Sequence, residues 1–290
     1  MPEVQGLVDF LDERLTARAL TSVQVVAFTA LKTFAIDPAR LVGGTIEAVS
    51  RHGKWLDVAV ETPDGERHLV FHLARAGWLR WFDELPARPA SRSPKSPIAL
   101  RVGVEGGSGF DLTEAGTRRK LAVYVVADPG EVPMIATLGP DPLGADFTVD
   151  TLRALLQRKN QQVKGMLRDQ ATIAGIGNAY SDEILHVAKI SPFAQTRSIA
   201  ADPETLSRLF DEIGETLQAA IAASSGKPAA ELKDAKRSGM RVHGRTGQDC
   251  PVCGDVVREV SFADSSLQYC ATCQTDGKVL ADRRLSKLLK

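Results

Sequence analysis

The sequence predicts a multidomain protein of the α+β class, with a β-rich N-terminal part, a helical middle part and a small cysteine-rich hairpin near the C-terminus. Three observations support this prediction. Short β-rich runs separated by turn residues occupy the first part, the apolar spacing changes to the helical period after Pro142, and all cysteines lie close together near the end. The composition, with 43% apolar and 25% charged residues, is that of an ordinary globular chain of 290 residues.

The composition also excludes some classes of protein. No apolar run is long enough to span a membrane and the N-terminus has no signal-peptide pattern, so we expect a cytoplasmic protein, associated with the nucleoid if the source is bacterial. The formal net charge is zero, which argues against a wholesale polyanion binder. Basic residues nevertheless cluster in residues 86–101, 153–168 and 233–245, either as solvated faces or as contacts for nucleic acid.

The N-terminal part predicts one helix followed by short strands. Apolar residues at helical spacing place a helix over residues 4–15. The clearest strand-like runs are residues 44–50, 55–60, 67–73 and 121–126. Turn residues between such runs favour a β-sandwich or barrel over alternating βαβ units. Residues 86–97, rich in Pro and Ser, are typical of an exposed loop.

The middle part predicts four helices. Three of them are marked by apolar groups at helical spacing: Leu152, Leu155 and Leu156; Val163, Met166 and Leu167; Ile184, Leu185 and Val187. The fourth begins at the capping pair Asp202 and Pro203 and ends at Gly226. A basic linker over residues 233–245 and a basic tail over residues 278–290 flank the cysteine segment.

The cysteines form two CxxC pairs, Cys250 with Cys253 and Cys270 with Cys273. In a chain without a signal peptide, this spacing is typical of a zinc ribbon, in which two knuckles present four thiolates to one ion. Two disulfides are the alternative interpretation. A closed four-thiolate site leaves no open coordination position, so we expect one structural Zn²⁺.

A glycine-rich turn precedes the third predicted helix. Gly175 and Gly177 allow a tight turn whose N–H groups point outward at a helix N-terminus, as in sites that bind phosphate, although a plain helix cap is equally compatible. A dinucleotide-binding fold would need a glycine at Tyr180 and a preceding strand, and neither is present. The phosphate of a polymer is therefore the better candidate ligand.

Residues 164–170 and 175–185 resemble the helix–two-turns–helix segment of the formamidopyrimidine-DNA glycosylase and endonuclease VIII family. The order of parts is also similar, since the chain has Pro2 and Glu3 at its start, strands, helices, and Cys273 followed by Gln274. The resemblance implies three domains. They are an N-terminal helix plus β-sandwich catalytic domain in residues 1–135, a helix–two-turns–helix DNA-binding domain in residues 145–235, and a four-cysteine zinc-finger β-hairpin with a basic tail in residues 245–290.

The same resemblance implies a base-excision-repair DNA glycosylase with abasic-site lyase activity. Removal of the initiator Met would leave the Pro2 amine free to form a Schiff base with C1′ of a flipped damaged nucleotide. An α-amino group titrates near pH 8, against about 10.4 for lysine, so part of it is neutral at pH 7. Glu3 matches a proton-transfer residue, and Lys54 resembles the hairpin lysine that contacts phosphate and assists elimination.

Five residues fall at DNA-binding positions of the family, and three of them match its residue types. Lys164 and Asn178 resemble its phosphate-gripping residues. Arg118 matches the arginine of the motif that fills the gap left by the flipped base. Two positions differ, because Arg75 stands at the intercalating methionine and Lys120 stands at the aromatic wedge. We expect a monomer that binds damaged double-stranded DNA, without a small-molecule cofactor and without a membrane.

Three further departures from the family bear on activity. The start is three residues shorter, so Glu3 matches either of two family glutamates, and Ser265 replaces the zinc-hairpin arginine. The linker in residues 232–244 is shorter than in 8-oxoguanine enzymes, which argues against a standard 8-oxoguanine specialist. A catalytically impaired damage-binding protein on the same scaffold is thus the alternative, and a zinc-ribbon module of transcription or RNA machinery is a third interpretation.

Overall fold

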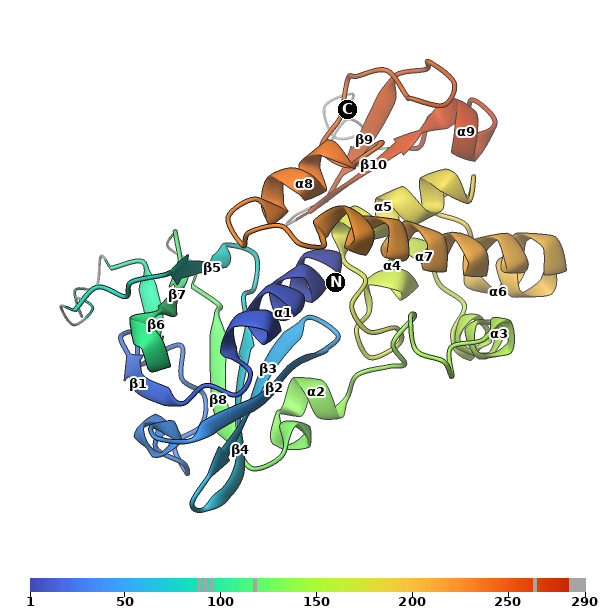
Figure 1. Cartoon of the computed structure of the whole chain (residues 1–290). Helices are drawn as coiled ribbons and strands as arrows, with labels where there is room; N and C mark the ends of the chain where they lie inside the picture. The colour runs from blue at the N-terminus through green and yellow to red at the C-terminus, as the bar shows by residue number, and fades with distance from the viewer. Residues whose placement is uncertain (88–89, 91–92, 94–95, 117–118, 263–264, 282–290) are drawn as a thin grey trace. The chain divides into compact units, whose positions relative to one another are not determined.

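A computed structural model describes the chain except for residues 88–89, 91–92, 94–95, 117–118, 263–264 and 282–290 (Figure 1). The chain divides into two compact units. The first, called the sandwich unit below, comprises residues 3–137 and 224–233, and the second, called the helical unit, comprises residues 1–2, 138–223 and 234–290. Among the described helices, none combines the length and apolar character needed to cross a bilayer.

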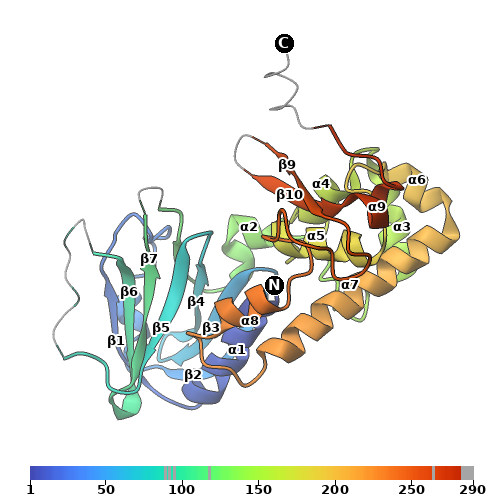
Figure 2. The same ribbon diagram turned by 90° about the horizontal axis from the view of Figure 1, so that it is seen from above.

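The sandwich unit contains two four-stranded antiparallel sheets (Figure 2). One sheet has the order β1-β6-β7-β5 and the other the order β2-β3-β4-β8. Their bounds are β1 Leu20–Val25, β2 Thr45–His52, β3 Trp55–Thr62, β4 Gly65–His72, β5 Gly77–Phe82, β6 Ile98–Val104, β7 Gly109–Glu114 and β8 Ala122–Val126. The prediction of a β-sandwich is confirmed.

The sandwich core explains which residues form these strands. Alternate residues of β3, among them Leu56, Val58 and Val60, are buried in one apolar cluster with residues of the other sheet. Helix α1 (Pro2–Leu15) contributes Leu7 and Leu11 to the same cluster. Burial at this spacing is what an amphipathic helix against a sheet requires. Short helical segments complete the unit: η1 Pro38–Leu41, η2 Glu105–Gly107, η3 Pro129–Glu131 and α2 Pro133–Ala136.

Strands β5, β6 and β7 were not singled out by the sequence pattern, because charged residues interrupt them. Arg101 of β6 and Asp111 of β7 form a bidentate ion pair, with Nε–Oδ1 and Nη2–Oδ2 distances of 2.7 and 2.8 Å. Both residues are buried, at 8% and 2% exposure. Each charge therefore depends on the other for compensation, since neither retains full hydration.

In its described residues, the helical unit contains the four predicted helices and three further short ones. Their bounds are α3 Val149–Arg158, α4 Val163–Arg168, α5 Asn178–Val187, α6 Thr196–Ala201, α7 Pro203–Ser224, α8 Leu232–Ser238 and α9 Ala271–Thr275, with α8 beginning in the sandwich unit. Asp202 accepts hydrogen bonds from the Glu204 N–H and the Thr205 hydroxyl, as a helix cap does. Gly226, with φ of 69°, follows the end of α7.

Helix α8 corrects the prediction of a plain basic linker after residue 232. Leu232 is fully buried in the sandwich core, where its side chain lies against Gly6 of α1. The short helix forms because this apolar contact anchors its first residue, which a charge-rich sequence pattern does not reveal.

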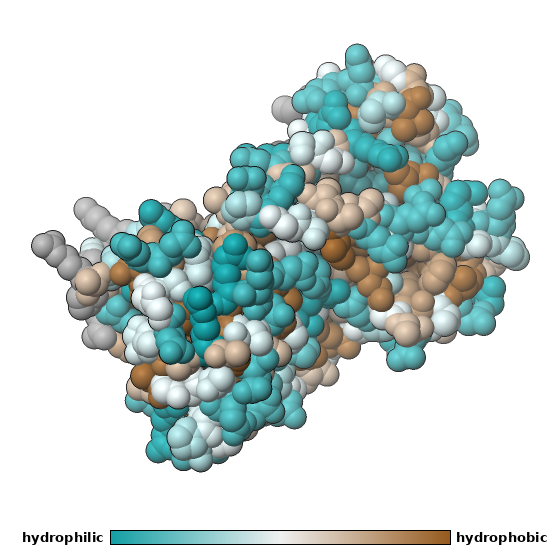
Figure 3. Space-filling model, in the orientation of Figure 1, coloured by the Kyte–Doolittle hydropathy of each residue, from teal (hydrophilic) through white to brown (hydrophobic). Residues whose placement is uncertain are grey.

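The C-terminal hairpin of the helical unit consists of β9 (Val257–Ser261) and β10 (Ser266–Cys270). It packs with β10 toward α5 (Figures 1 and 2). Over the face drawn in Figure 3, hydrophilic side chains cover most of the surface and apolar ones form only small groups. In its described residues, this face therefore presents no large apolar surface that would mark a functional site.

The buried ion pair gives a first prediction. Replacing Asp111 with Ala should lower the free energy of unfolding of the sandwich unit by about 3 kcal/mol, because Arg101 loses its buried carboxylate. Urea unfolding followed by tryptophan fluorescence reports on this unit, since Trp55, Trp78 and Trp81 all lie in it. Glu13→Ala, which removes a pair with Arg14 whose glutamate is 75% exposed, is the control and should change the same quantity by less than about 0.5 kcal/mol. Equal effects of the two variants would contradict the prediction.

Candidate functional site

The predicted nucleophile lies at the very start of a helix. Pro2 is the first residue of α1 and Glu3 lies in its first turn. Proline suits this position because its missing N–H would have no helical partner there, and a carboxylate in the first turn complements the helix dipole. Glu3 is 9% exposed. Pro2 and Glu3 are therefore held at the N-terminal end of α1.

Lys54 lies at the tip of the β2–β3 hairpin. Gly53 has φ of 59°, which a tight two-residue hairpin turn requires and which glycine adopts without strain. Arg51 of β2 donates from Nε to Oε1 of Gln5 on α1, at 2.6 Å. This contact ties the base of the Lys54 turn to the first turns of α1.

A histidine–aspartate–histidine cluster supports the same hairpin. The Asp57 carboxylate on β3 contacts His52 Nε2 at 3.1 Å and His68 Nδ1 at 2.9 Å. Asp57 is 3% exposed, so both imidazole contacts offset the loss of its hydration. Sequence reasoning missed this cluster. The available signal in the sequence was Asp57 itself, a charged residue within the otherwise apolar run of residues 55–60.

His72 links the Lys54 hairpin with the loop that carries Arg75. Its ring packs on Trp55 with centroids 4.8 Å apart, and its Nδ1 accepts the Ala74 N–H at 3.0 Å. Burial, and then the nearby Lys54, lower the pKa of His72 to about 4. A neutral ring keeps the Nδ1 lone pair available for Ala74. Arg75 itself is exposed on the loop that this hydrogen bond holds.

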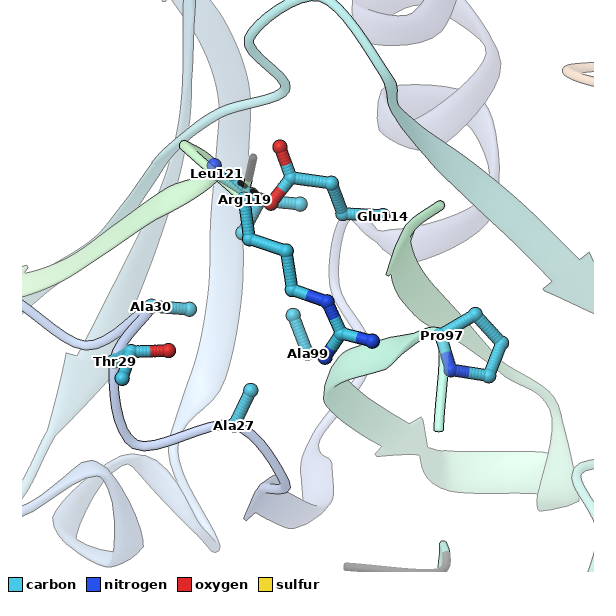
Figure 4. A pocket seen from close by; sticks show the side chains of 8 residues that line it. All are labelled: Ala27, Thr29, Ala30, Pro97, Ala99, Glu114, Arg119 and Leu121. Atoms are coloured by element: carbon cyan, nitrogen blue, oxygen red, sulfur yellow. Dashed lines mark hydrogen bonds between the residues drawn. The ribbon is translucent and has the colours of Figure 1, made fainter. Parts of the chain in front are cut away.

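The loop expected to carry the wedge residues is held by Glu114. The Glu114 carboxylate accepts the N–H groups of Lys120 and Leu121 at 2.8 and 2.9 Å. The Lys120 side chain is exposed, whereas Arg118 lies outside the described residues. Figure 4 shows the neighbouring Arg119 side chain along a small pocket beside Ala99. The described part of this loop thus presents the exposed cation of Lys120.

The glycine turn before α5 is braced from within. Gly175, with φ of 87°, donates its N–H to Gln170 Oε1 at 2.9 Å, and Gln170 Nε2 donates to the Ile176 carbonyl at 2.7 Å. The prediction that the Gly175 N–H points outward is therefore wrong. The physical reason is that Gln170 supplies an internal acceptor that the sequence pattern did not reveal.

Lys164 of α4 is 5% exposed and faces α5. Its Nζ donates to Asp182 Oδ1 at 2.5 Å, to Ser181 Oγ at 2.7 Å and to the Asn178 carbonyl at 3.2 Å. Burial lowers its pKa, although Asp182 opposes that change. An ammonium has three N–H donors, and these contacts use all of them inside the protein.

Asn178, the first residue of α5, contacts the C-terminal hairpin. Its Nδ2 donates to the Ser266 carbonyl at 2.8 Å, next to Ser265 at the turn between β9 and β10. Its Oδ1 has no hydrogen-bond partner within the described part of the chain. The residue predicted to grip phosphate is thus oriented by the hairpin.

The four cysteines lie together at the end of that hairpin. Their Sγ atoms all lie within 4.8 Å of one another, with Cys253–Cys270 at 3.4 Å and Cys250–Cys273 at 3.9 Å. These separations are far above an S–S bond length of about 2.05 Å, so the disulfide alternative is wrong. Four thiolates about 2.3 Å from one Zn²⁺ in a tetrahedron lie roughly 3.8 Å apart, which fits.

Burial raises the pKa of the Cys270 thiol to about 11 and also raises the pKa of Cys273. Thiolates at these positions therefore need a bound cation, and zinc binding must release protons. Gln274 braces the second knuckle, because its Oε1 accepts the Cys270 N–H at 2.9 Å and its Nε2 donates to the Ile190 carbonyl at 2.9 Å. The knuckle is thereby fixed to the chain just after α5.

Two buried carboxylates of α5 hold the segment before the zinc knuckles. Glu183 accepts the backbone N–H groups of Arg241, Val242 and His243, at 2.7 to 3.0 Å. Asp182 contacts His243 Nδ1 at 2.7 Å in addition to Lys164. Sequence reasoning also missed these roles, since neither carboxylate differs in pattern from a solvated helix residue.

Comparison with known proteins identifies three matching regions. Residues 1–123 match the formamidopyrimidine-DNA glycosylase N-terminal domain, residues 138–230 match the H2TH domain of the same enzyme, and residues 247–275 match a zinc finger found in FPG and IleRS. The four cysteines therefore hold one structural zinc ion.

Several curated relatives match almost the whole chain. The formamidopyrimidine-DNA glycosylase of Rhizorhabdus wittichii is 34% identical over 284 residues, which cover 94% of this chain and 98% of that protein. The enzyme of Chloroflexus aurantiacus is 30% identical over 282 residues, with 94% and 96% covered. An uncharacterized formamidopyrimidine-DNA glycosylase-like protein of Mycobacterium tuberculosis is 56% identical over 158 residues, which cover 54% of this chain and 98% of that protein.

Solved structures show the same fold. Lactococcus lactis Fpg in complex with DNA that contains an abasic site superposes with a TM-score of 0.80 and 25% identity, covering 95% of this chain and 99% of that one. MutM in complex with DNA that contains carbocyclic 8-oxo-G has a TM-score of 0.80 at 23% identity, with the same coverage.

The lowered pKa of His72 predicts an acid-sensitive sandwich unit. Above pH 6.5 the ring is neutral in both states, but between pH 6.5 and about 4 the unfolded ring binds a proton that the folded ring does not. The free energy of unfolding should fall by about 2 kcal/mol between pH 7 and pH 5 from this group. In His72→Gln, urea unfolding followed by tryptophan fluorescence should show a smaller loss over this range. An unchanged pH dependence would contradict the prediction.

Zinc removal gives another prediction. A chelator that strips the ion should unfold the segment from about residue 245 to the C-terminus and abolish DNA binding, because a small zinc ribbon has little core of its own. Hydrogen exchange locates the unfolded segment, and fluorescence anisotropy with an abasic duplex measures binding. Unchanged affinity for the abasic duplex after complete zinc removal would contradict this prediction.

Proposed function

Because the chain belongs to the formamidopyrimidine-DNA glycosylase family, we propose that it is a base-excision-repair DNA glycosylase that also cleaves the resulting abasic site. The observation that carries this proposal is the position of Pro2, Glu3 and Lys54. Pro2 and Glu3 begin α1, and the turn that carries Lys54 is tied to the same helix by the Arg51–Gln5 hydrogen bond.

In the proposed first step, the Pro2 amine attacks C1′ of a flipped nucleotide and the bond from C1′ to the damaged base breaks. The base leaves with the proton of the amine. The C1′–O4′ bond then opens as O4′ takes up a proton, and the iminium that results links Pro2 to the ring-opened sugar. The N-terminal end of α1 carries positive partial charge, which disfavours the protonated form of an amine placed there and favours the nucleophilic form. Removal of the residue before Pro2 is needed, because an amide nitrogen is not a nucleophile.

In the second step, loss of a proton from C2′ lets the 3′ phosphate leave. Glu3, which lies in the same first turn, is the proposed proton-transfer group. Lys54 supplies a cation toward the phosphate from the tip of its hairpin. His72 supports this arrangement, because its contacts with Trp55 and Ala74 hold the Lys54 turn and the Arg75 loop at one end of the sandwich.

Damaged double-stranded DNA is the proposed partner of the other site residues. Asn178 would contact phosphate, whereas Lys164, which is buried, would act through its internal contact with Asn178. Arg75 and Arg118 would lie near the flipped nucleotide. Lys120 would meet the DNA as a cation, which interacts with phosphate or a base edge rather than wedging between bases as an aromatic ring does.

A catalytically impaired damage-binding protein remains the second candidate, and Ser265 is the observation that favours it. Its carbonyl accepts the Phe262 N–H at the turn of the zinc hairpin, and its side chain carries no charge. Without a hairpin arginine, contacts with the phosphates around the flipped nucleotide are weakened. The two candidates differ in one respect that can be measured, which is covalent chemistry.

Borohydride trapping on a duplex with a single abasic site tests the lyase. The processed protein should yield a covalent adduct, because borohydride reduces the iminium to a stable amine. Pro2→Gly and a form with an unprocessed N-terminus should reduce adduct formation by at least about 100-fold. Affinity for a tetrahydrofuran duplex, measured in parallel, should remain. Tight binding without any adduct would refute the lyase and establish the damage-binding alternative.

A further inference from the structure

One face of α5 contacts the zinc-binding segment, which here means the chain from residue 241 through the zinc hairpin. Asn178, Asp182 and His186 are spaced four residues apart, which places them on one side of a helix. Asn178 contacts the Ser266 carbonyl, Asp182 contacts His243, and His186 Nε2 lies 3.3 Å from Cys250 Sγ. Each turn of α5 is therefore joined to a different part of the zinc-binding segment.

The His186 contact is directed at a zinc ligand from outside the ligand set. His186 is 1% exposed, and its Nδ1 has no hydrogen-bond partner among the described residues. The tautomer with the proton on Nε2 donates to the sulfur and leaves only a lone pair unsatisfied. The other tautomer would bury an unsatisfied N–H and set a lone pair against a thiolate, which is the costlier arrangement.

We propose that His186 is a positioning residue of the zinc centre, and that through it α5 couples zinc binding to the orientation of Asn178. The Nε2–H···Sγ hydrogen bond stabilises the Cys250 thiolate, and a hydrogen bond to an ionised acceptor is stronger than a neutral one. The coupling has two contacts, because zinc also orders β10, whose Ser266 carbonyl holds the Asn178 amide. Loss of the ion would release both ends of the same helix face.

This proposal does not depend on glycosylase chemistry, because zinc affinity is measured without DNA. His186→Phe keeps a ring of similar size and removes the donor, whereas His186→Gln returns a donor near the Nε2 position. Zinc release to a chromophoric chelator should be about tenfold faster in His186→Phe and close to the original rate in His186→Gln. Glu13→Ala, a substitution of an exposed residue in the sandwich unit, should release zinc at the original rate.

Cobalt and cadmium give spectroscopic tests of the hydrogen bond itself. In the cobalt-loaded protein, the thiolate-to-cobalt charge-transfer band should shift in His186→Phe and return in His186→Gln, since a donor to the sulfur lowers the energy of its electrons. In the unsubstituted sequence loaded with ¹¹³Cd, the His186 ring Hε2 should show scalar coupling to the metal. This second measurement needs no substitution and remains decisive if a variant fails to fold.

DNA affinity as a function of free zinc tests the coupling. With a tetrahydrofuran duplex, His186→Phe should reach half of its binding at about tenfold higher free zinc and should reach the original affinity when saturated. An unchanged zinc release rate, or no Hε2–cadmium coupling, would overturn the positioning role. Faster release with a DNA affinity that does not respond to zinc would overturn the coupling to Asn178. Neither result concerns the lyase, which borohydride trapping decides separately.

Discussion

The compensation of two buried carboxylates on α5 is the constraint on which the helical unit depends. Asp182 and Glu183 are 1% and 4% exposed, and charges at such positions are stable only when they are paired or hydrogen-bonded. Lys164 and His243 satisfy Asp182, and the three consecutive N–H groups of residues 241–243 satisfy Glu183. These contacts fix the course of the chain into the first zinc knuckle. These hydrogen bonds therefore hold α5 and the zinc-binding segment in a fixed position relative to each other.

This constraint changes how the proposed DNA-binding residues are understood. Lys164, which resembles a phosphate-gripping residue in sequence, has its ammonium engaged by α5, so the proposed role of Lys164 is to act through the Asn178 carbonyl rather than to contact DNA itself. Asn178 is in turn held by the hairpin at Ser266. In the sandwich unit, His72 has a comparable organising role between Trp55 and Ala74. In both units, polar contacts with neighbouring residues hold in place the groups that are proposed to meet the substrate.

The sequence alone predicted several features correctly. Cys250, Cys253, Cys270 and Cys273 were identifiable as zinc ligands because two CxxC pairs at this spacing have few other uses in a chain without a signal peptide. The long helix after Asp202 was predictable because its cap, its apolar stripe and its terminal Gly226 agree. The sandwich was predictable from its short apolar strands. Strands β5 to β7 were not predicted individually because charged residues interrupt their apolar pattern, and the sequence does not show that Arg101 and Asp111 neutralise each other. These are properties of neighbouring residues, which a linear pattern records.

What only the tertiary structure decided is the partner of each polar side chain. Glu183 and His243 are separated in sequence by the whole of α6, α7 and α8, and His186 and Cys250 are 64 residues apart, so no local pattern relates them. The Gly175 N–H was expected to face outward, but it donates to the side chain of Gln170 instead. Local spacing determines helices, strands and metal knuckles because these depend on near neighbours in the chain. Charge compensation and tautomer choice depend on groups brought together by folding, and only the folded chain specifies them.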